Sequence, residues 1–259
     1  MVASSPSRRR EGPFSALKNN CSLKTVARTA ISKSHDWYEK LRPNRAARMM
    51  TRSATKLGRI QNISMRCLIV TAHPLNPSLC QTLSKAAIDA LMDAKHQCRH
   101  VDLYRSGFFP ALTPAERASY YSGFETTEVA KEIEDLLWAE TIVLIFPTWW
   151  FGPPAILKGW FDRVWVPGIA YDHAADLGAI QPRLRQLRKV VAITTLGSPW
   201  WVDWLILRRP VRRVLKTAIL NTCAPQASLT FLSFYKVESL PRQGVDAAIN
   251  RIRSMLQRL

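Results

Sequence analysis

Short apolar runs alternate with longer amphipathic segments from Met65 onward. The runs are rich in β-branched residues and have the length of buried strands; they cover 66–72, 99–103, 141–146, 189–194 and 227–234. Apolar residues at helical spacing predict helices over 79–91, 126–138, 155–164, 200–220 and 244–259, with a break at Pro210 and an irregular, turn-rich stretch over 104–123. Strands that alternate with helices at this pitch predict an α/β fold, in which a five-stranded parallel sheet carries helices on both faces.

Residues 1–64 lack this pattern. They hold 14 Lys and Arg against three acidic residues, so they carry +11 of the formal net charge of +18 and leave +7 for 65–259. Three interpretations stay open: a disordered basic tail, an organelle-targeting presequence, or residues preceding a true start at Met65. We therefore expect an N-terminal extension over 1–64 and one folded domain over 65–259.

Composition argues against several classes of protein. The five cysteines are scattered and form no CxxC pair, which favours a reducing, cytoplasmic environment and no metal site. Charged residues interrupt every apolar run before the roughly 18 residues that a membrane-spanning helix needs. The excess positive charge lies mostly in the extension without a recognised nucleic-acid-binding module, so no nucleic-acid partner is expected.

Three of the predicted strands end in loops with unusual residues. These loops cover 73–80, 147–151 and 194–197. In an open α/β sheet, ligands bind beyond the carboxyl ends of the strands, at the point where the strand order reverses. The sequence therefore predicts one ligand site that these three loops build together.

The second loop and the helix after it read FPTWWFGPPAILKGWFDRVW over 146–165. This segment closely resembles the flavodoxin-like NAD(P)H:quinone oxidoreductase family, which includes DT-diaphorase and its bacterial relatives. The resemblance covers 65–259 and leaves out 1–64. It implies a flavodoxin-like, doubly wound sheet, FMN or FAD as cofactor, NADH or NADPH as electron donor, and two-electron reduction of a quinone, azo or nitro compound.

A flavin ring is flat and largely apolar, and three consecutive aromatic side chains cannot all point into a core. By resemblance, the backbone of the second loop binds the flavin, and we assign to the cofactor Pro147, Thr148, Trp149, Trp150 and Phe151. The following helix packs against a second subunit in relatives. Its residues Leu157, Lys158, Trp160 and Arg163 are therefore expected to be structural.

The first loop resembles the family's phosphate-binding turn, and it opens into a helix whose N–H groups and dipole suit a phosphate. The residues expected to contact the phosphate are His73, Ser78, Leu79 and Cys80. Phe and Asn are common at the last two positions in the family, so the Cys80 side chain is expected to pack rather than bind. The third loop resembles a Thr-Thr-Gly-Gly-Ser turn at the pyrimidine edge of the flavin, which assigns Thr194, Thr195, Leu196 and Gly197 to the cofactor.

The resemblance weakens after the third loop. Animal quinone reductases carry a Tyr and a His there, whereas 196–220 contains neither, so the catalytic acid or base stays unknown. Trp150, Trp200, Trp201 and Trp204 are expected to wall the acceptor site; a dimer or core contact is the alternative for the last three. Tyr171 matches a stretch that lies near the partner subunit's site in relatives, which implies substrate binding and a homodimer.

Two questions stay open at the level of sequence. The first concerns the arginine cluster at 208, 209, 212 and 213, which either forms a solvated face or contacts nucleotide phosphates or anionic lipid headgroups.

The second concerns the activity. The chain is expected to be an NAD(P)H dehydrogenase (quinone)-like flavoenzyme. The alternative is a flavin-binding ancillary subunit of a membrane transport system.

Overall fold

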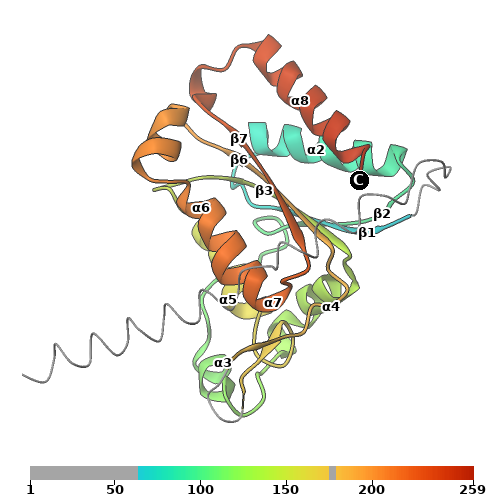
Figure 1. Cartoon of the computed structure of the whole chain (residues 1–259), viewed down its shortest axis with the longest axis vertical. Coiled ribbons are helices and arrows are strands. Elements are labelled where there is room, and N and C mark those ends of the chain that lie inside the picture. Colours follow the sequence, from blue (N-terminus) through green and yellow to red (C-terminus); the bar gives the residue numbers. More distant parts are fainter. Residues whose placement is uncertain (1–63, 175–178) are drawn as a thin grey trace, which may run out of the picture. The chain divides into compact units, whose positions relative to one another are not determined.

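A computed structural model of the chain describes residues 64–174 and 179–259 (Figure 1). The expectations for the N-terminal extension therefore lie outside the described residues, apart from Ser64. No helix in the described part is both long and apolar enough to cross a membrane.

One five-stranded sheet forms the centre of the domain, and every neighbouring pair of its strands is parallel. Its strand order is β2-β1-β3-β6-β7, so the chain turns to one side of β1 and then returns to build the other side. The strands are β1 Arg66–Thr71, β2 Gln97–Asp102, β3 Thr141–Pro147, β6 Lys189–Thr195 and β7 Ser228–Phe234. The predicted sheet of five parallel strands with helices on both faces is confirmed.

Successive strand residues serve opposite faces of the sheet, because side chains alternate along a strand. Ile69, Val143 and Ile193 pack with helices α2 (Leu79–Asp93) and α8 (Arg242–Leu256) in one apolar cluster. Leu68, Leu144 and Ala192 pack in another with α4 (Ala130–Trp138), α5 (Ala155–Val164) and the segment from α6 (Pro210–Arg213) to α7 (Asn221–Cys223). Both faces of each central strand are thus buried, which is why these strands read as continuous apolar runs. Figure 1 shows α2 and α8 together on one side of the sheet and α4 to α7 on the other. The helices are α2 Leu79–Asp93, α4 Ala130–Trp138, α5 Ala155–Val164, α6 Pro210–Arg213, α7 Asn221–Cys223 and α8 Arg242–Leu256.

Several details differ from the expectation. The stretch expected to be irregular contains a short helix, α3 Pro114–Ser119, which Thr113 and Glu116 cap reciprocally. A small antiparallel pair, β4 Tyr171–Asp172 and β5 Gln181–Pro182, was not expected. The stretch expected as one helix with a break is wound in wide turns, η3 Val202–Ile206 and η4 Val214–Leu220, and it breaks immediately before Pro210. Single 3-10 turns, η2 Thr127–Val129 and η5 Val237–Ser239, complete the described elements.

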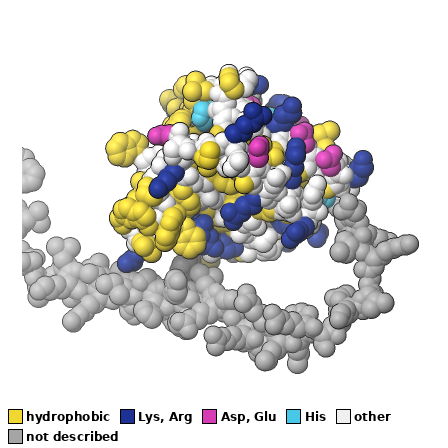
Figure 2. All heavy atoms as spheres, turned by 90° about the horizontal axis from the view of Figure 1, so that it is seen from above, with side chains coloured by type: hydrophobic (Ala, Val, Ile, Leu, Met, Phe, Trp, Pro, Cys, Tyr) yellow, Lys and Arg dark blue, Asp and Glu magenta, His cyan; other side chains and the backbone are white. Residues whose placement is uncertain are grey.

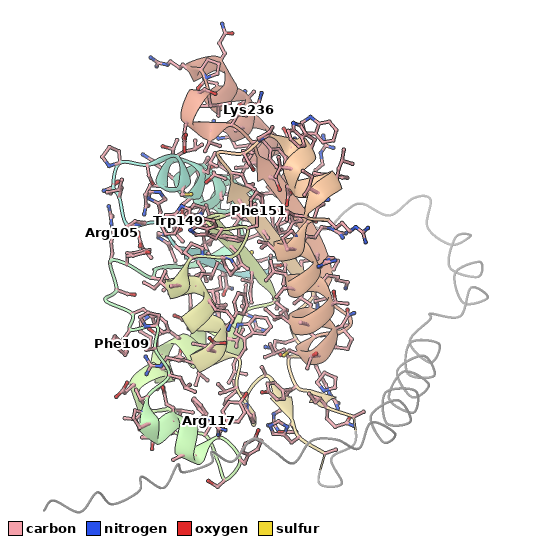
Figure 3. The ribbon with its side chains drawn as sticks, turned by 90° about the vertical axis from the view of Figure 1, so that its left-hand side faces the viewer. Arg105, Phe109, Arg117, Trp149, Phe151 and Lys236 are labelled. Atoms are coloured by element: carbon pink, nitrogen blue, oxygen red, sulfur yellow. The ribbon has the colours of Figure 1, made fainter. Side chains whose placement is uncertain are left out.

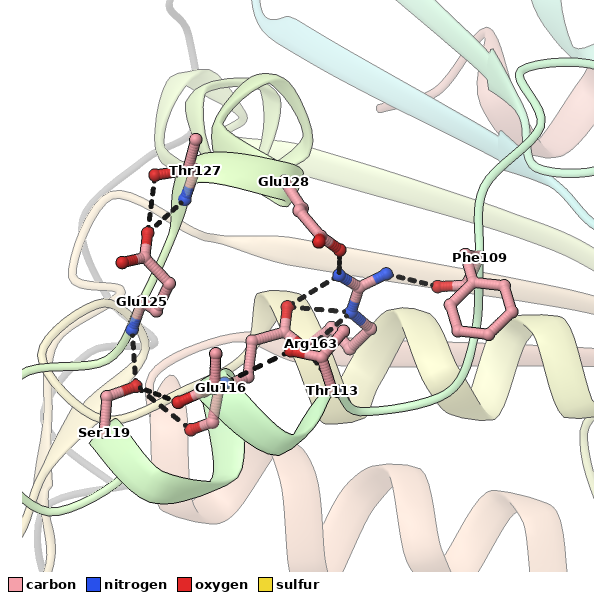
Figure 4. A network of polar contacts seen from close by, with 9 residues as sticks. Phe109, Thr113, Glu116, Ser119, Glu125, Thr127, Glu128 and Arg163 are labelled. Carbon is pink, nitrogen blue, oxygen red and sulfur yellow. Dashed lines mark hydrogen bonds and ion pairs between the residues drawn. The ribbon is translucent and has the colours of Figure 1, made fainter.

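A buried arginine fixes α5, the helix that follows the second loop (Figure 4). Arg163 is 2% exposed and donates to both carboxylate oxygens of Glu116, its nearest contact being 2.7 Å, and to Glu128 at 2.7 Å. It also donates to the carbonyl oxygen of Phe109. Arg163 thereby joins α5 to α3 and η2, a contact that serves the fold and touches none of the three predicted ligand loops.

Candidate active site

The three loops predicted to bind a ligand emerge from one edge of the sheet. β1, β3 and β6 are neighbours and parallel, so the loops after Thr71, Pro147 and Thr195 all start at their carboxyl ends. The strand order reverses between β1 and β3, which is where this class of sheet binds ligands. Figure 3 shows two residues of the second loop, Trp149 and Phe151, close together at this edge.

The first loop and the start of α2 bring several hydrogen-bond donors together. The Ser78 hydroxyl accepts a hydrogen bond from the N–H of Gln81 at 3.2 Å, so its own hydrogen stays available to donate. The N–H groups of Leu79 and Cys80 open the helix and have no carbonyl partner within it. His73 accepts from the N–H of Leu75 through Nδ1 at 3.1 Å. These donors suit a phosphate at the helix N-terminus.

The second loop is a tight turn with an unusual backbone. The N–H and carbonyl of Trp149 bond to the carbonyl and N–H of Gly152 at 3.0 and 2.9 Å. Between them, Trp150 and Phe151 both adopt left-handed conformations, with φ of 48° and 55°. Such a conformation costs roughly 1–3 kcal/mol for a non-glycine residue and clusters at ligand sites. Trp150 is fully exposed and Trp149 is half-exposed, so these two rings do not fill the core.

Threonine hydroxyls join the loops to one another. Thr148 and Thr194 share a hydrogen bond of 2.6 Å between their Oγ1 atoms, and the N–H of Thr148 donates to the carbonyl of Thr195 at 2.8 Å. Thr195 in turn lies 3.6 Å from the Cys80 sulfur. Thr194 and Thr195 are buried, and their hydroxyls connect the three loops to one another.

The remaining residues of this edge are packed closely. Leu196 is buried and donates its N–H to the carbonyl of Phe234 at 2.8 Å. A Cβ on Gly197 would approach the Glu238 carboxylate to 3.0 Å, so the small residue suits the position. His73 and Trp149 bring the first and second loops together, with ring centroids 6.3 Å apart.

Cys80 is not a nucleophile in this arrangement. Burial raises the pKa of its thiol to about 11, although the contact with Thr195 lowers it somewhat. A thiol that stays protonated at neutral pH is a packing group. No cluster of three or more His, Cys, Asp or Glu side chains suited to a metal ion occurs among residues 64–174 and 179–259.

The structure gathers only some of the predicted substrate residues. Tyr171 lines a cavity of about 800 Å³ together with Phe151, which was expected to bind the cofactor. Trp150, Trp200 and Trp201 lie outside that cavity; the first is fully exposed and the other two are half-exposed. The Tyr171 hydroxyl lies 2.5 Å from that of Tyr120. Burial and this contact raise the pKa of Tyr171, which therefore stays protonated.

Sequence reasoning missed a buried polar group beside the third loop. The Tyr235 hydroxyl donates to the Asp203 carboxylate at 2.7 Å and accepts from the Trp204 indole N–H at 3.0 Å. Asp203 is buried, and the N–H of Lys236 donates to the carbonyl of Ser198 at 3.3 Å. The signal was available, because Tyr235 directly follows the fifth strand at the same edge of the sheet. The third loop thus has a tyrosine nearby although 196–220 contains none.

Comparisons with known proteins agree with the fold. The family model Flavodoxin_2, described as a flavodoxin-like fold, matches residues 65–256. An Escherichia coli (strain K12) protein named Uncharacterized NAD(P)H oxidoreductase YcaK is 38% identical over 116 residues, which are 44% of this chain and 59% of that protein. NAD(P)H dehydrogenase [quinone] 1 of Rattus norvegicus is 34% identical over 152 residues, covering 51% of this chain and 54% of that protein.

A solved structure is similar over most of the folded part. The NAD(P)H:quinone oxidoreductase from Methanothermobacter marburgensis superposes with a TM-score of 0.64 at 25% identity, covering 75% of this chain and 95% of that one. The chain spans only a little more than half of the length of the two curated relatives above. Their whole-protein activities are therefore a basis for a proposal rather than a property of this chain.

Proposed function

The chain belongs to the Flavodoxin_2 family of flavodoxin-like folds, and from this membership we propose that it is a flavoenzyme that reduces a quinone or similar acceptor with NADH or NADPH. The reaction is a two-electron hydride transfer, as in an NAD(P)H dehydrogenase (quinone). The names of the relatives, among them NAD(P)H dehydrogenase [quinone] 1, support this activity.

The observation that carries the proposal is the left-handed turn at Trp149–Gly152 beside the open start of α2. The turn lies at the strand-order reversal and exposes aromatic surface next to His73. A flat ring with a phosphate tail fits this arrangement: helix N–H groups and Ser78 for the phosphate, the second loop, 147–151, for the ring, and the third loop, 194–197, for the ring's polar edge. FMN and FAD both meet this description.

A bound flavin would accept a hydride from the nicotinamide and pass it to the acceptor. The chain's own task is to hold the reactants in sequence against one face of that ring. Trp150, Trp200 and Trp201 supply exposed aromatic surface beside the loops, and Tyr171 supplies a hydroxyl in the adjoining cavity. We assign no catalytic acid or base.

A homodimer is part of the proposal. The cavity that Phe151 and Tyr171 share continues along exposed or half-buried apolar residues of α6 and η4, including Val214 and Ile219. A second copy seated there would cover this surface and bring its own residues to the edge of the site. A cytoplasmic location is proposed as well, because the four described cysteines are all free.

The test is the absorbance spectrum of the purified full chain, recorded before and after anaerobic addition of NADPH and then NADH. We expect a yellow protein that either nucleotide bleaches and that a quinone restores. A yellow protein that does not bleach would favour the ancillary-subunit alternative. A colourless protein that neither FMN nor FAD reconstitutes would refute the flavin site.

A site variant sharpens the same experiment. His73→Ala removes the ring that faces Trp149 and should lower flavin occupancy several-fold. His173→Ala is the matched control and should keep the flavin, because the His173 ring packs on Tyr171, which belongs to none of the three loops. Equal occupancy in both variants would refute the role of the first loop.

A further inference from the structure

An exposed apolar turn flanked by arginines protrudes from the segment after the third loop. We call residues 204–213 the arginine-flanked tip. Trp204 is 49% exposed, Leu205 67% and Ile206 61%, and these three consecutive large residues lie in the wide turn η3. Consecutive exposed residues of this size on a folded domain indicate an interaction surface.

The tip is held rigidly in its exposed position. Its Trp204 donates to Tyr235, whose hydroxyl is anchored on the buried carboxylate of Asp203. The guanidinium of Arg209 lies 4.2 Å from the centroid of the Trp204 ring and covers one of its faces. Arg208 and Arg209 both adopt left-handed φ values, 55° and 53°, and so turn the chain sharply after the apolar residues 204–206. These contacts therefore hold Leu205 and Ile206 in their exposed positions.

The charge on the tip itself has one sign. From Trp204 through Lys236 the sequence contains six Lys and Arg and no Asp or Glu. Arg208, Arg212 and Arg213 are exposed, and none of them pairs with a carboxylate among residues 64–174 and 179–259. Figure 2 shows a face of the molecule on which hydrophobic side chains gather with Lys and Arg around them.

We propose that the arginine-flanked tip docks the protein on an anionic lipid surface. Leu205 and Ile206 would enter the boundary between headgroups and acyl chains, while the arginines contact the lipid phosphates. Interfacial membrane anchors combine these two features, because apolar insertion alone or a few charges alone bind weakly. The indole of Trp204 suits the same depth, since its ring is apolar and its N–H is already bonded.

A second copy of the chain is the competing occupant, and charge argues against it. A two-fold contact centred on the tip would bring Arg208, Arg212 and Arg213 of both copies to the same patch without a carboxylate between them. The cavity proposed for dimer contact includes Pro210 and Val211 of the tip, but none of residues 204–209 lines it. The exposed apolar residues of the tip, 204–206, therefore lie outside the proposed dimer surface.

Docking through the tip has a consequence that rests on the proposed function. Trp200 and Trp201, proposed as walls of the acceptor site, lie on the same segment only a few residues from the tip. A tip in the lipid boundary would place that wall at the membrane surface. The acceptor class that fits is a quinone dissolved in the lipid.

The experiment measures co-sedimentation of the full chain with vesicles of phosphatidylglycerol and with vesicles of phosphatidylcholine. Two variants alter the tip: Leu205→Ser/Ile206→Ser removes the apolar part, and Arg208→Gln/Arg212→Gln/Arg213→Gln removes the charges. The matched charge control is Arg242→Gln/Arg251→Gln/Arg253→Gln, three exposed arginines of α8. The matched apolar control is Met92→Ser/Leu137→Ser, two exposed residues elsewhere.

Each basic residue near an anionic surface strengthens binding about fivefold. The arginine variant should therefore bind phosphatidylglycerol vesicles roughly 100-fold more weakly, and the apolar variant about tenfold more weakly. Both controls should bind like the unchanged chain to within a few-fold. All chains should bind phosphatidylcholine weakly, and rising salt should weaken binding to phosphatidylglycerol.

Four outcomes would overturn the proposal. Tip variants that bind as tightly as the unchanged chain would assign vesicle binding to other cations, such as those of 1–64. An equal loss of vesicle binding in the α8 arginine control would show that binding depends on the total positive charge and not on the position of the arginines. Tip variants that become monomeric without losing vesicle binding would show that the tip contacts a second copy of the chain. Tip variants that raise the KM for NADPH without losing vesicle binding would show that the tip contacts the nucleotide phosphate. Flavin content, measured in the same samples, separates this result from the proposed function: a colourless chain that still docks through the tip would sink the flavoenzyme and leave the docking surface standing.

Discussion

Replacing Arg163 by Met should unfold the domain at a much lower temperature. The guanidinium is 2% exposed and serves two carboxylates and a backbone carbonyl, while Glu116 is equally buried. Met fills most of the arginine stem but leaves the Glu116 charge in the interior without its partner. Breaking a buried ion pair in this way costs about 3–5 kcal/mol.

The assay is thermal unfolding followed by circular dichroism. For a domain of this size, 1 kcal/mol corresponds to about 2–4 °C in Tm, so Arg163→Met should lower Tm by roughly 6–20 °C. The matched control is Lys158→Met in the same helix, whose ion pair with Asp162 is short, at 2.5 Å, but largely exposed. Exposed pairs contribute about 0–1 kcal/mol, so the control should move Tm by only a few degrees.

A second substitution tests the cause directly. Arg163→Met/Glu116→Gln removes the stranded charge and should recover a large part of the lost stability, because the penalty arises from the unpaired carboxylate. A fall in Tm for Arg163→Met no larger than that of Lys158→Met would refute the reasoning. A double variant less stable than Arg163→Met would do the same, since it would show that the arginine stabilises α5 by packing alone.

The same network predicts a dependence on pH. Burial alone would raise the pKa of Glu116, but hydrogen bonds from Arg163 and from the Thr113 N–H hold it below its ordinary value of 4.5. A depressed pKa in the folded state means that the stabilisation is complete above pH 4.5 and is lost as the pH falls further. In urea titrations, the difference in unfolding free energy between the unchanged chain and Glu116→Gln should therefore shrink on acidification below pH 4.5. A difference that grows on acidification would contradict the assigned sign.

Two further substitutions probe close packing and the buried tyrosine. A Cβ on Gly159 would clash with the backbone oxygen of Pro110, so Gly159→Ala should cost about 1–3 kcal/mol or more in denaturant unfolding. The matched control is Gly244→Ala, whose Cβ would meet the flexible side chain of Leu240, and it should be nearly neutral. Tyr235→Phe leaves the buried Asp203 carboxylate without its donor and should cost about 1–3 kcal/mol, and an unchanged urea midpoint would show that water replaces the hydroxyl.

The sheet was predictable because its central strands are buried on both faces. Runs such as 141–146 are apolar at every position, and a segment of that length between turn residues has few other interpretations. The breaks were predictable for a similar reason, since Pro210 cannot continue a helix that precedes it. Here local sequence and tertiary packing favour the same structure, so the pattern alone was sufficient.

The missed features depend on residues far apart in the sequence. The pair β4–β5 consists of two residues in each strand, too short for any periodicity, and it forms through contacts across the intervening segment. Helix α3 exists because Glu116 both caps it and pairs with Arg163, 47 residues later. Tyr235 reaches Asp203 only because β7 lies beside β6. Such pairings follow from topology, which strand patterns restrict but do not determine.

Cys80 stands where the family commonly has Asn, and the structure explains this difference in a way that the sequence could not. In the first loop, the side chain at this position points inward to Thr195, and Thr148 bonds to Thr194 on the neighbouring strand. Side-chain contacts thus connect the third loop to the first and to the second. The N–H of Cys80 at the start of α2 does not depend on the side chain. A thiol in place of an amide therefore changes the contact between loops and leaves that N–H unchanged.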